Sequence, residues 1–277
     1  MRRRSWIALT AGMAGSFWVS AAVGAPPAII DTEAATILGR GPETVVFVHT
    51  VAGSRADWMQ QARSLADRYR VIALDLIGHG RRAGQAKDGV TIRAMADDVV
   101  ATLDRLGVRR AYFVGNLAGA TIIYDLAARM PDRIAGVVTV NSTGDIPAGP
   151  LAPRESAFRE LGADLPKLWE GMLTTSTPAT RRTVLRGVRQ TNPVVIRTFF
   201  HEFLFTFDPK PGLRAIADRM VSIHGPQPDD PTAPHRLERA IGNLVIDTKS
   251  AWPQLDQPEL CTALIRAALL GLDRDAR

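Results

Sequence analysis

From about residue 42 onward, the chain alternates short apolar runs with longer amphipathic segments. The apolar runs are rich in β-branched residues and predict strands at 44–49, 70–75, 111–115, 134–141, 219–225 and 243–248. The segments between them have helical spacing and predict helices at 55–69, 91–107, 118–130, near 232–241 and at 258–272. Because continuous apolar strands alternate with helices, the pattern predicts an α/β fold with a mostly parallel, doubly wound sheet covered on both faces.

Residues 142–214 interrupt this alternation with several prolines and with helical pieces such as "VVIRTFFHEFLFTF" (194–207). We interpret this stretch as a helical cap inserted over the sheet. The insertion divides the predicted core into an N-terminal part, 26–141, and a C-terminal part, 215–277. We expect the phenylalanine-rich stripe of the cap to form the core of the cap rather than the wall of a ligand site.

The first 25 residues have the pattern of an export signal. Arginines at positions 2–4 precede an uncharged run that ends in the small-residue stretch "SAAVGAPP". The arginine pair followed by "SWI" also resembles a twin-arginine signal. We favour cleavage after Ala22 or Gly24 over retention of the apolar run as a membrane anchor. The sequence therefore predicts an exported protein, periplasmic or extracellular, that meets a membrane only if this segment stays attached.

Composition and charge narrow the possible partners. Removal of residues 1–24 lowers the formal charge from +6 to +3, because three arginines and no acidic residues are lost. No Lys/Arg stripe with interleaved aromatic residues is present, so we expect no nucleic-acid binding. Cys261 is the only cysteine, so we expect a buried helix residue and no internal disulfide. The spacing of His and Cys predicts no metal site, and we expect no cofactor. The sequence makes no prediction of the oligomeric state.

Four motifs occur in an order typical of one superfamily. They are "VFVHTVAGSRADW", "VIALDLIGHGRR", "LDRLGVRRAYFVGNLAGA" and "WPQLDQPE". They resemble, in turn, the oxyanion loop, the glycine-rich turn, the approach to the nucleophile elbow and the tail of the histidine loop of the α/β-hydrolase superfamily. The resemblance covers roughly residues 40–141 and 215–270 and points to the branch of small esterases, haloperoxidases and C–C hydrolases. It implies catalysis by a nucleophile, an acid and a histidine on three loops.

The three positions that carry this triad in the superfamily hold other residues here. The elbow pattern, Gly-x-nucleophile-x-Gly, falls on residues 115–119 and places Leu117 at the nucleophile. The acid position, three residues after the glycine that ends its strand, is Pro228, and the histidine position is Ala251. Neither leucine nor alanine can attack a carbonyl or carry a proton, so the usual mechanism is absent. Since the elbow residue normally has a positive φ, we expect either a strained Leu117 or a relaxed elbow.

The backbone part of the site remains in the sequence. The resemblance implies main-chain N–H donors for an oxyanion at Ala118 and Val51. Thr50 replaces the glycine that usually follows the histidine of this loop, and we expect this change to narrow the loop. The candidate ligand contacts are Thr50, Val51, Leu117, Ala118 and Trp252.

The histidines are the remaining candidates for acid or base chemistry. His49 and His79 match motif positions at which we expect structural roles. His224 ends a predicted strand at the sheet edge that carries the site, and it lies close in sequence to Asp229 and His235. We expect a structural or solvent-facing role for His224, but keep these three residues as the alternative acid or base.

Two classes of function follow. The first is an exported, non-catalytic pseudo-hydrolase that binds a small apolar ligand with a carbonyl or carboxylate group, or a partner protein, under its cap. The second is an enzyme that uses the fold for lyase-like, isomerase-like or rearranged hydrolytic chemistry. The second class requires a histidine and a carboxylate within hydrogen-bond reach beside Leu117, whereas the first requires only a lined cavity.

Overall fold

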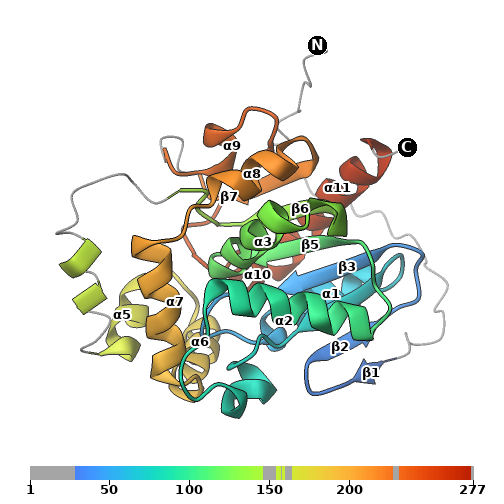
Figure 1. Ribbon diagram of the computed structural model, residues 1–277. Helices are drawn as coiled ribbons and strands as arrows, with labels where there is room; N and C mark the ends of the chain where they lie inside the picture. The colour runs from blue at the N-terminus through green and yellow to red at the C-terminus, as the bar shows by residue number, and fades with distance from the viewer. Residues whose placement is uncertain (1–28, 146–153, 157, 160–163, 227–230, 276–277) are drawn as a thin grey trace.

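The computed structural model describes residues 29–145, 154–156, 158–159, 164–226 and 231–275. In this part of the chain, eight strands form one sheet in the order β1-β2-β4-β3-β5-β6-β7-β8 (Figure 1). The strands are β1 (Ile30–Asp31), β2 (Ala35–Leu38), β3 (Thr44–Val48), β4 (Arg70–Leu74), β5 (Ala111–Asn116), β6 (Ile134–Val140), β7 (Met220–His224) and β8 (Gly242–Val245). Strands β3 to β8 are parallel, and β1 and β2 add an antiparallel edge. This topology confirms the predicted α/β fold class.

Helices cover both faces of the sheet (Figure 1). One face carries α2 (Ile92–Arg105), α3 (Ala118–Arg129) and α8 (Lys210–Ile216), and the other carries α1 (Met59–Leu65) and α11 (Pro258–Asp275). Side chains alternate along each strand, so Val46 and Val48 of β3 pack toward the first set and Val45 and Phe47 toward the second. Because both faces are buried, these strands are continuous apolar runs in the sequence.

Three longer helices in the described part of the insertion form the cap, at one end of the sheet (Figure 1). They are α5 (Leu165–Met172), α6 (Pro178–Gln190) and α7 (Pro193–Phe205). Each has a proline in its first turn and a side-chain N-cap, which is Asp164, Thr177 or Asn192. Glu202 of α7 accepts a hydrogen bond from the Ile92 N–H at the start of α2, with 2.6 Å between the atoms, and so ties the cap to the core. The next helix, α8, packs on α3, so the predicted cap boundary at 214 falls inside a core helix.

Several elements differ from the sequence predictions. The edge strands β1 and β2 were not predicted. The predicted helix 55–69 is a 3-10 helix, η1 (Arg55–Trp58), followed by α1. The predicted helix near 232–241 is only α9 (Pro234–Leu237), because the backbone of Glu238 is extended. The predicted strand 243–248 is the shorter β8.

The remaining short elements are η2 (Gly80–Gln85), η3 (Pro131–Arg133), η4 (Ala217–Arg219) and α10 (Pro253–Asp256). Among the helices of the described ranges, none has the length and apolar character needed to cross a membrane. The predicted export signal lies outside these ranges.

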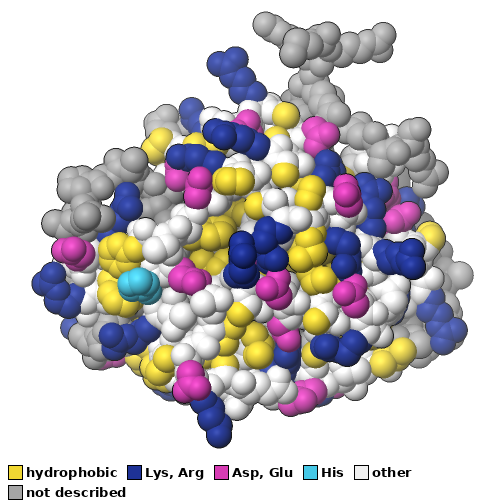
Figure 2. All heavy atoms as spheres, in the orientation of Figure 1, with side chains coloured by type: hydrophobic (Ala, Val, Ile, Leu, Met, Phe, Trp, Pro, Cys, Tyr) yellow, Lys and Arg dark blue, Asp and Glu magenta, His cyan; other side chains and the backbone are white. Residues whose placement is uncertain are grey.

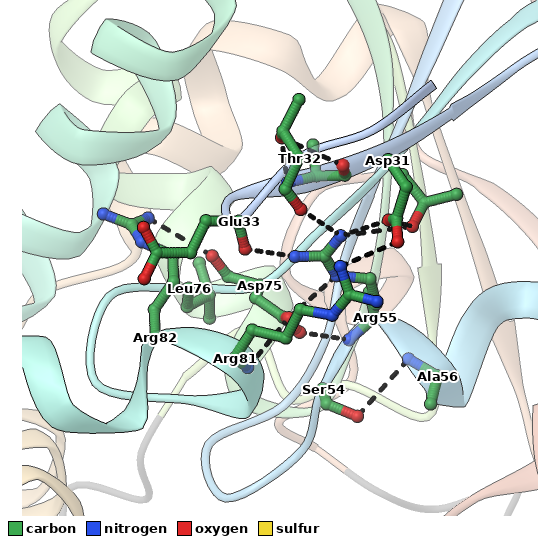
Figure 3. Close-up of polar contacts among 12 residues, drawn as sticks. Asp31, Thr32, Glu33, Ser54, Arg55, Ala56, Asp75, Leu76, Arg81 and Arg82 are labelled. Carbon is green, nitrogen blue, oxygen red and sulfur yellow. Dashed lines mark hydrogen bonds and ion pairs between the residues drawn. The ribbon is translucent and has the colours of Figure 1, made fainter. Parts of the chain in front are cut away.

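An ion-pair network centred on the buried pair Arg55 and Asp75 fastens the N-terminal edge strands to the loop after β3 (Figure 3). The Arg55 guanidinium donates through Nε to Asp75 at 2.7 Å and through Nη1 to Asp31 and to the Thr32 carbonyl, each at 2.9 Å. The Asp75 carboxylate also accepts from the N–H groups of Arg55 and Arg81. Both Arg55 and Asp75 are buried, so this cluster fixes the loop that continues from residue 49 to the start of η1.

Candidate functional site

Leu117 occupies the sharp turn between β5 and α3. Its backbone has φ 47° and ψ −119°, a conformation that residues with a Cβ rarely adopt. Of the two alternatives set out above, the structure has the strained Leu117 and not the relaxed elbow.

Close packing of the two glycines keeps this turn tight. A Cβ on Gly119 would lie 2.3 Å from the Val48 carbonyl oxygen, and a Cβ on Gly115 would lie 2.7 Å from a methyl carbon of Ile123. The turn therefore packs directly against β3, and larger residues at 115 and 119 would push it away. The elbow keeps its shape although its central side chain cannot react.

Thr50 closes part of the expected oxyanion site. Its hydroxyl accepts a hydrogen bond from the Ala118 N–H, with 3.3 Å between Oγ1 and N. The Ala118 N–H that the resemblance assigns to an oxyanion is therefore bonded within the protein. In the described part of the chain, the other expected donor, the Val51 N–H, has no hydrogen-bond partner. The expected pair of donors is thus reduced to one.

Two buried histidines support this loop. The His49 ring lies 2.7 Å from the Thr50 carbonyl through Nδ1, and its Nε2 accepts from the Leu76 N–H at 3.1 Å, which makes Nδ1 the protonated nitrogen. Burial lowers the pKa of His49. Burial and the neighbouring His49 lower the pKa of His79 to about 3. Both rings are neutral near pH 7, and their contacts agree with structural roles.

The 3-10 helix that follows this loop, η1, holds a buried carboxyl group, Asp57, that the sequence reasoning did not consider. One of its oxygens accepts from the Ser54 N–H at 3.2 Å. Burial, reinforced by the negative charge of Asp75, raises the pKa of Asp57 to about 7 against the lowering effect of the Ser54 bond. Asp57 and Thr50 border a cavity of about 250 Å³ between the loop and α6.

The position expected for the catalytic histidine is held by amides instead of a titratable group. The Ala251 carbonyl accepts from the Asn116 side chain at 3.1 Å, and the same nitrogen donates to the Val140 carbonyl at 2.8 Å. Gln254 donates to the Asn116 side-chain oxygen at 3.1 Å. This chain of amides fixes the floor around Leu117 without a group that could move a proton at neutral pH.

His224 lies at the cavity but has both ring nitrogens in contact with polar groups. Its Nδ1 lies 2.7 Å from the Gly225 carbonyl, and its Nε2 contacts the Asn243 side chain. Its ring stacks on His235, with 4.4 Å between the centroids and 12° between the planes. No carboxylate among the residues with assigned positions contacts His224. Pro228 and Asp229 lie outside the described residues.

These elements enclose a cavity of about 400 Å³ between the elbow and the cap. All five candidate ligand contacts, Thr50, Val51, Leu117, Ala118 and Trp252, border it, as does Ala251. The cap wall consists of Trp169, Met172, Phe199, Phe200 and Phe203. The polar part of the lining consists of Thr121, Asn141, Ser142, Thr143, His224, Thr248, Lys249 and Ser250.

The cap wall corrects one expectation. The phenylalanine stripe was expected to be cap core, but Phe199, Phe200 and Phe203 line the cavity. Their spacing on α7 puts all three on the side that faces the elbow, whereas Phe205 packs against Phe158 on another side of the cap. Phe199 is also fully buried, so this residue serves both as core and as wall.

The sequence reasoning missed Asn141, which connects three loops of the site. Asn141 follows β6 with φ 46°. Its side-chain oxygen accepts from the Gly225 N–H at 2.9 Å, and its nitrogen donates to the Ser250 carbonyl at 2.6 Å. An asparagine directly after a buried strand was the available signal, because asparagine tolerates positive φ better than other residues with a Cβ.

The described residues contain no group of three or more His, Cys, Asp or Glu that could hold a metal ion. Cys261 is buried in α11, and burial raises the pKa of its thiol to about 12.

Known proteins with related sequences match part of the chain. A family model described as alpha/beta hydrolase fold matches residues 43–185. The dihydrolipoyllysine-residue acetyltransferase component of the acetoin cleaving system of Cupriavidus necator is 37% identical over 106 residues, which are 38% of this chain and 28% of that protein. RutD of Caulobacter sp. strain K31, named provisionally as a carbamate hydrolase, is 39% identical over 99 residues, 36% of this chain and 37% of that protein. The chain thus spans well under half the length of these relatives.

Solved structures resemble the chain over a larger part of its length. A thermophilic esterase from Thermogutta terrifontis superimposes with a TM-score of 0.70 and 22% identity, covering 86% of this chain and 94% of the esterase. The enol-lactonase from Burkholderia xenovorans LB400 has a TM-score of 0.70 and 20% identity, covering 84% of this chain and 92% of the lactonase. At these identities the likeness shows a shared fold. Because the family model matches more than half of the chain and the sheet topology agrees with it, the chain belongs to the α/β hydrolase fold family.

Proposed function

We propose that this protein is a non-catalytic α/β hydrolase that binds a small apolar ligand with a carbonyl or carboxylate group in the cavity under its cap. One observation carries the proposal. The elbow that would present a nucleophile to this cavity presents Leu117, while the adjacent Ala118 N–H is already bonded to Thr50. A site of this kind can hold a molecule but has no group to attack it.

The cavity supports binding on physical grounds. Its volume of about 400 Å³ lies in the range of small-molecule sites. The aromatic cap wall would remove the apolar part of a ligand from water, which contributes roughly 25 cal/mol for each Å² buried. The hydroxyl and amide groups opposite, together with Lys249 and the Val51 N–H, would take the polar end. Lys249 is exposed and makes no ion pair with another described residue.

Export is part of the same proposal. The arginines at positions 2–4 and the apolar run that follows them support a signal segment, so we propose that the ligand is met outside the cytoplasm. A partner protein that covers the cap is the corresponding alternative to a small molecule.

The enzymatic alternative rests on His224, which borders the cavity and stacks on His235. If His224 acts as a base, turnover would require it to exchange its contacts with Gly225 and Asn243 for a substrate. The non-catalytic proposal is preferred because both ring nitrogens already have partners.

The test combines binding and turnover. We would titrate the purified protein with the fluorescent probe anilinonaphthalene sulfonate, displace it with octanoate, and assay p-nitrophenyl acetate and butyrate in parallel. Met172→Trp places bulk in the cavity mouth, and Val194→Trp is the matched control on an exposed helix residue outside the lining. We expect no turnover of either ester, and binding of the probe that octanoate displaces. Met172→Trp should weaken this binding at least tenfold, and Val194→Trp should leave it unchanged. Ester turnover that is lost in His224→Ala would instead support the enzymatic alternative.

A further inference from the structure

Cap helix α6 carries a strip of arginines without compensating charge. Arg182, Arg186 and Arg189 are exposed, and they form no ion pair or hydrogen bond with the described residues. Arg181, beside them, donates to the Leu173 carbonyl at 3.0 Å and forms no ion pair with an acidic residue of the described ranges. The sequence of α6, "PATRRTVLRGVRQ", contains no Asp or Glu.

This pattern differs from that of many other arginines in the molecule. Arg82, Arg129 and Arg133, for example, are each paired with an aspartate. On the face shown in Figure 2, basic and acidic side chains are interspersed. Like charges three and four residues apart repel each other on a helix, so the α6 strip opposes helix formation rather than supporting it.

The strip has the geometry of a surface that meets many anions at once. The arginines and Leu185 line an open groove along the helix. From residue 182 to 189 the helix rises by about 10 Å, so the guanidinium groups of Arg182, Arg186 and Arg189 are spread over two turns. A single phosphate cannot contact all of them, whereas neighbouring headgroups of a lipid surface can. Guanidinium groups bind phosphate oxygens in a bidentate manner.

We propose that α6 is a docking surface for an anionic phospholipid membrane. Two observations favour lipid over nucleic acid. Aromatic residues, on which bases would stack, are absent from α6. The arginines at 2–4 and the apolar run after them form a segment of the kind that engages membranes during export. Docking through α6 would place the cap, which forms one wall of the cavity, next to the bilayer. This proposal is independent of whether the cavity binds a ligand.

The test is sedimentation of the full chain with vesicles. One set contains phosphatidylcholine alone and the other about 30% phosphatidylglycerol, at low and high salt, because salt screens exposed charges. We compare Arg182→Gln/Arg186→Gln/Arg189→Gln with a control of equal charge change, Arg40→Gln/Arg63→Gln/Arg93→Gln. The control residues are also exposed and have no ion pair with the described residues. Thermal unfolding of both variants confirms that they are folded.

We expect binding to the anionic vesicles that falls with salt. Each basic residue near such a surface raises the affinity for anionic vesicles about fivefold. The α6 variant should therefore bind these vesicles about 100-fold more weakly than the wild type, and the control variant less than about threefold more weakly. Equal losses in the two variants, or equal binding of the wild type to both vesicle types, would overturn the proposal. It would also be overturned by displacement from vesicles by millimolar inorganic phosphate, or by tighter binding to an RNA oligonucleotide that depends on the same arginines.

Discussion

The Thr50 hydroxyl accepts a hydrogen bond from the Ala118 N–H across 3.3 Å, and so joins the loop after β3 to the first turn of α3. These residues are 68 positions apart in the chain. The bond occupies one of the two main-chain donors that the family resemblance assigns to an oxyanion. Under the proposed non-catalytic function, this bond is a second feature, beside Leu117 at the elbow, that disfavours acyl transfer.

This relationship predicts that a nucleophile alone does not restore hydrolysis. Leu117→Ser should be inactive on p-nitrophenyl butyrate. The triple variant Leu117→Ser/Ala251→His/Pro228→Asp should turn over slowly, and addition of Thr50→Gly should accelerate it by about 10²–10³, the usual contribution of one oxyanion donor. Initial rates at saturating ester check this. Equal rates with and without Thr50→Gly would show that the threonine does not block the donor.

The strained turn predicts that glycine is more stabilising than alanine at position 117, the reverse of their usual order. Leu117→Gly should be more stable than Leu117→Ala by about 1 kcal/mol, since glycine removes a strain of about 1–3 kcal/mol and loses about 0.5–1 kcal/mol through backbone entropy. Urea unfolding of both variants measures the difference.

The control for this prediction is Leu260, which lies in α11 and is 39% exposed. There, alanine should be more stable than glycine by about 1 kcal/mol. If alanine is also the better residue at 117, the positive φ carries no appreciable strain.

The buried network around Arg55 predicts a large loss of stability on removal of one partner. Arg55→Ala leaves the buried Asp75 carboxylate without its guanidinium, and we expect a loss of about 3–5 kcal/mol in the free energy of unfolding. Arg266→Ala, which breaks an exposed pair with Asp67, should cost less than about 1 kcal/mol. Chemical denaturation of both variants tests this, and similar small losses would mean that water replaces the partner of Asp75.

Asp57 predicts a pH dependence of stability. Its pKa of about 7 in the folded protein exceeds the ordinary aspartate value near 3.8, so the folded state binds the proton more tightly. The free energy of unfolding is therefore not reduced by Asp57 below about pH 4, where this group is protonated in both the folded and the unfolded state. It falls by roughly 2–4 kcal/mol as the pH rises to about 7. Asp57→Asn lacks this dependence and should be more stable than the wild type above pH 7.

The measurement is the difference in unfolding free energy between Asp57→Asn and the wild type from pH 4 to pH 8. The difference isolates Asp57 from His49 and His79, whose lowered pKa values have the opposite effect, with stability lost as the pH falls below about 6.5. A difference that does not change with pH would mean that Asp57 titrates normally.

The sequence predicted the central sheet because β3 to β6 are buried on both faces and are therefore continuous apolar runs. It did not predict β1 and β2, which have two and four residues and depend on pairing with β4. The position of Leu117 followed from the glycines around it. The bond from Ala118 to Thr50 could not be predicted, nor could the link of Asn141 to Ser250, because only the folded sheet brings such distant loops together.

The network around Arg55 also sets a limit on how much of the N-terminus the domain can lose. The guanidinium is held by the Asp31 carboxylate and by the carbonyl groups of Thr32 and Glu33, all within the first described residues. A protease that cuts before Ile30 leaves these partners in place. One that cuts a few residues later removes them and leaves Asp75 as the acidic partner of Arg55. The loop that carries Thr50, and with it one wall of the cavity, therefore loses part of its support when residues 31–33 are removed.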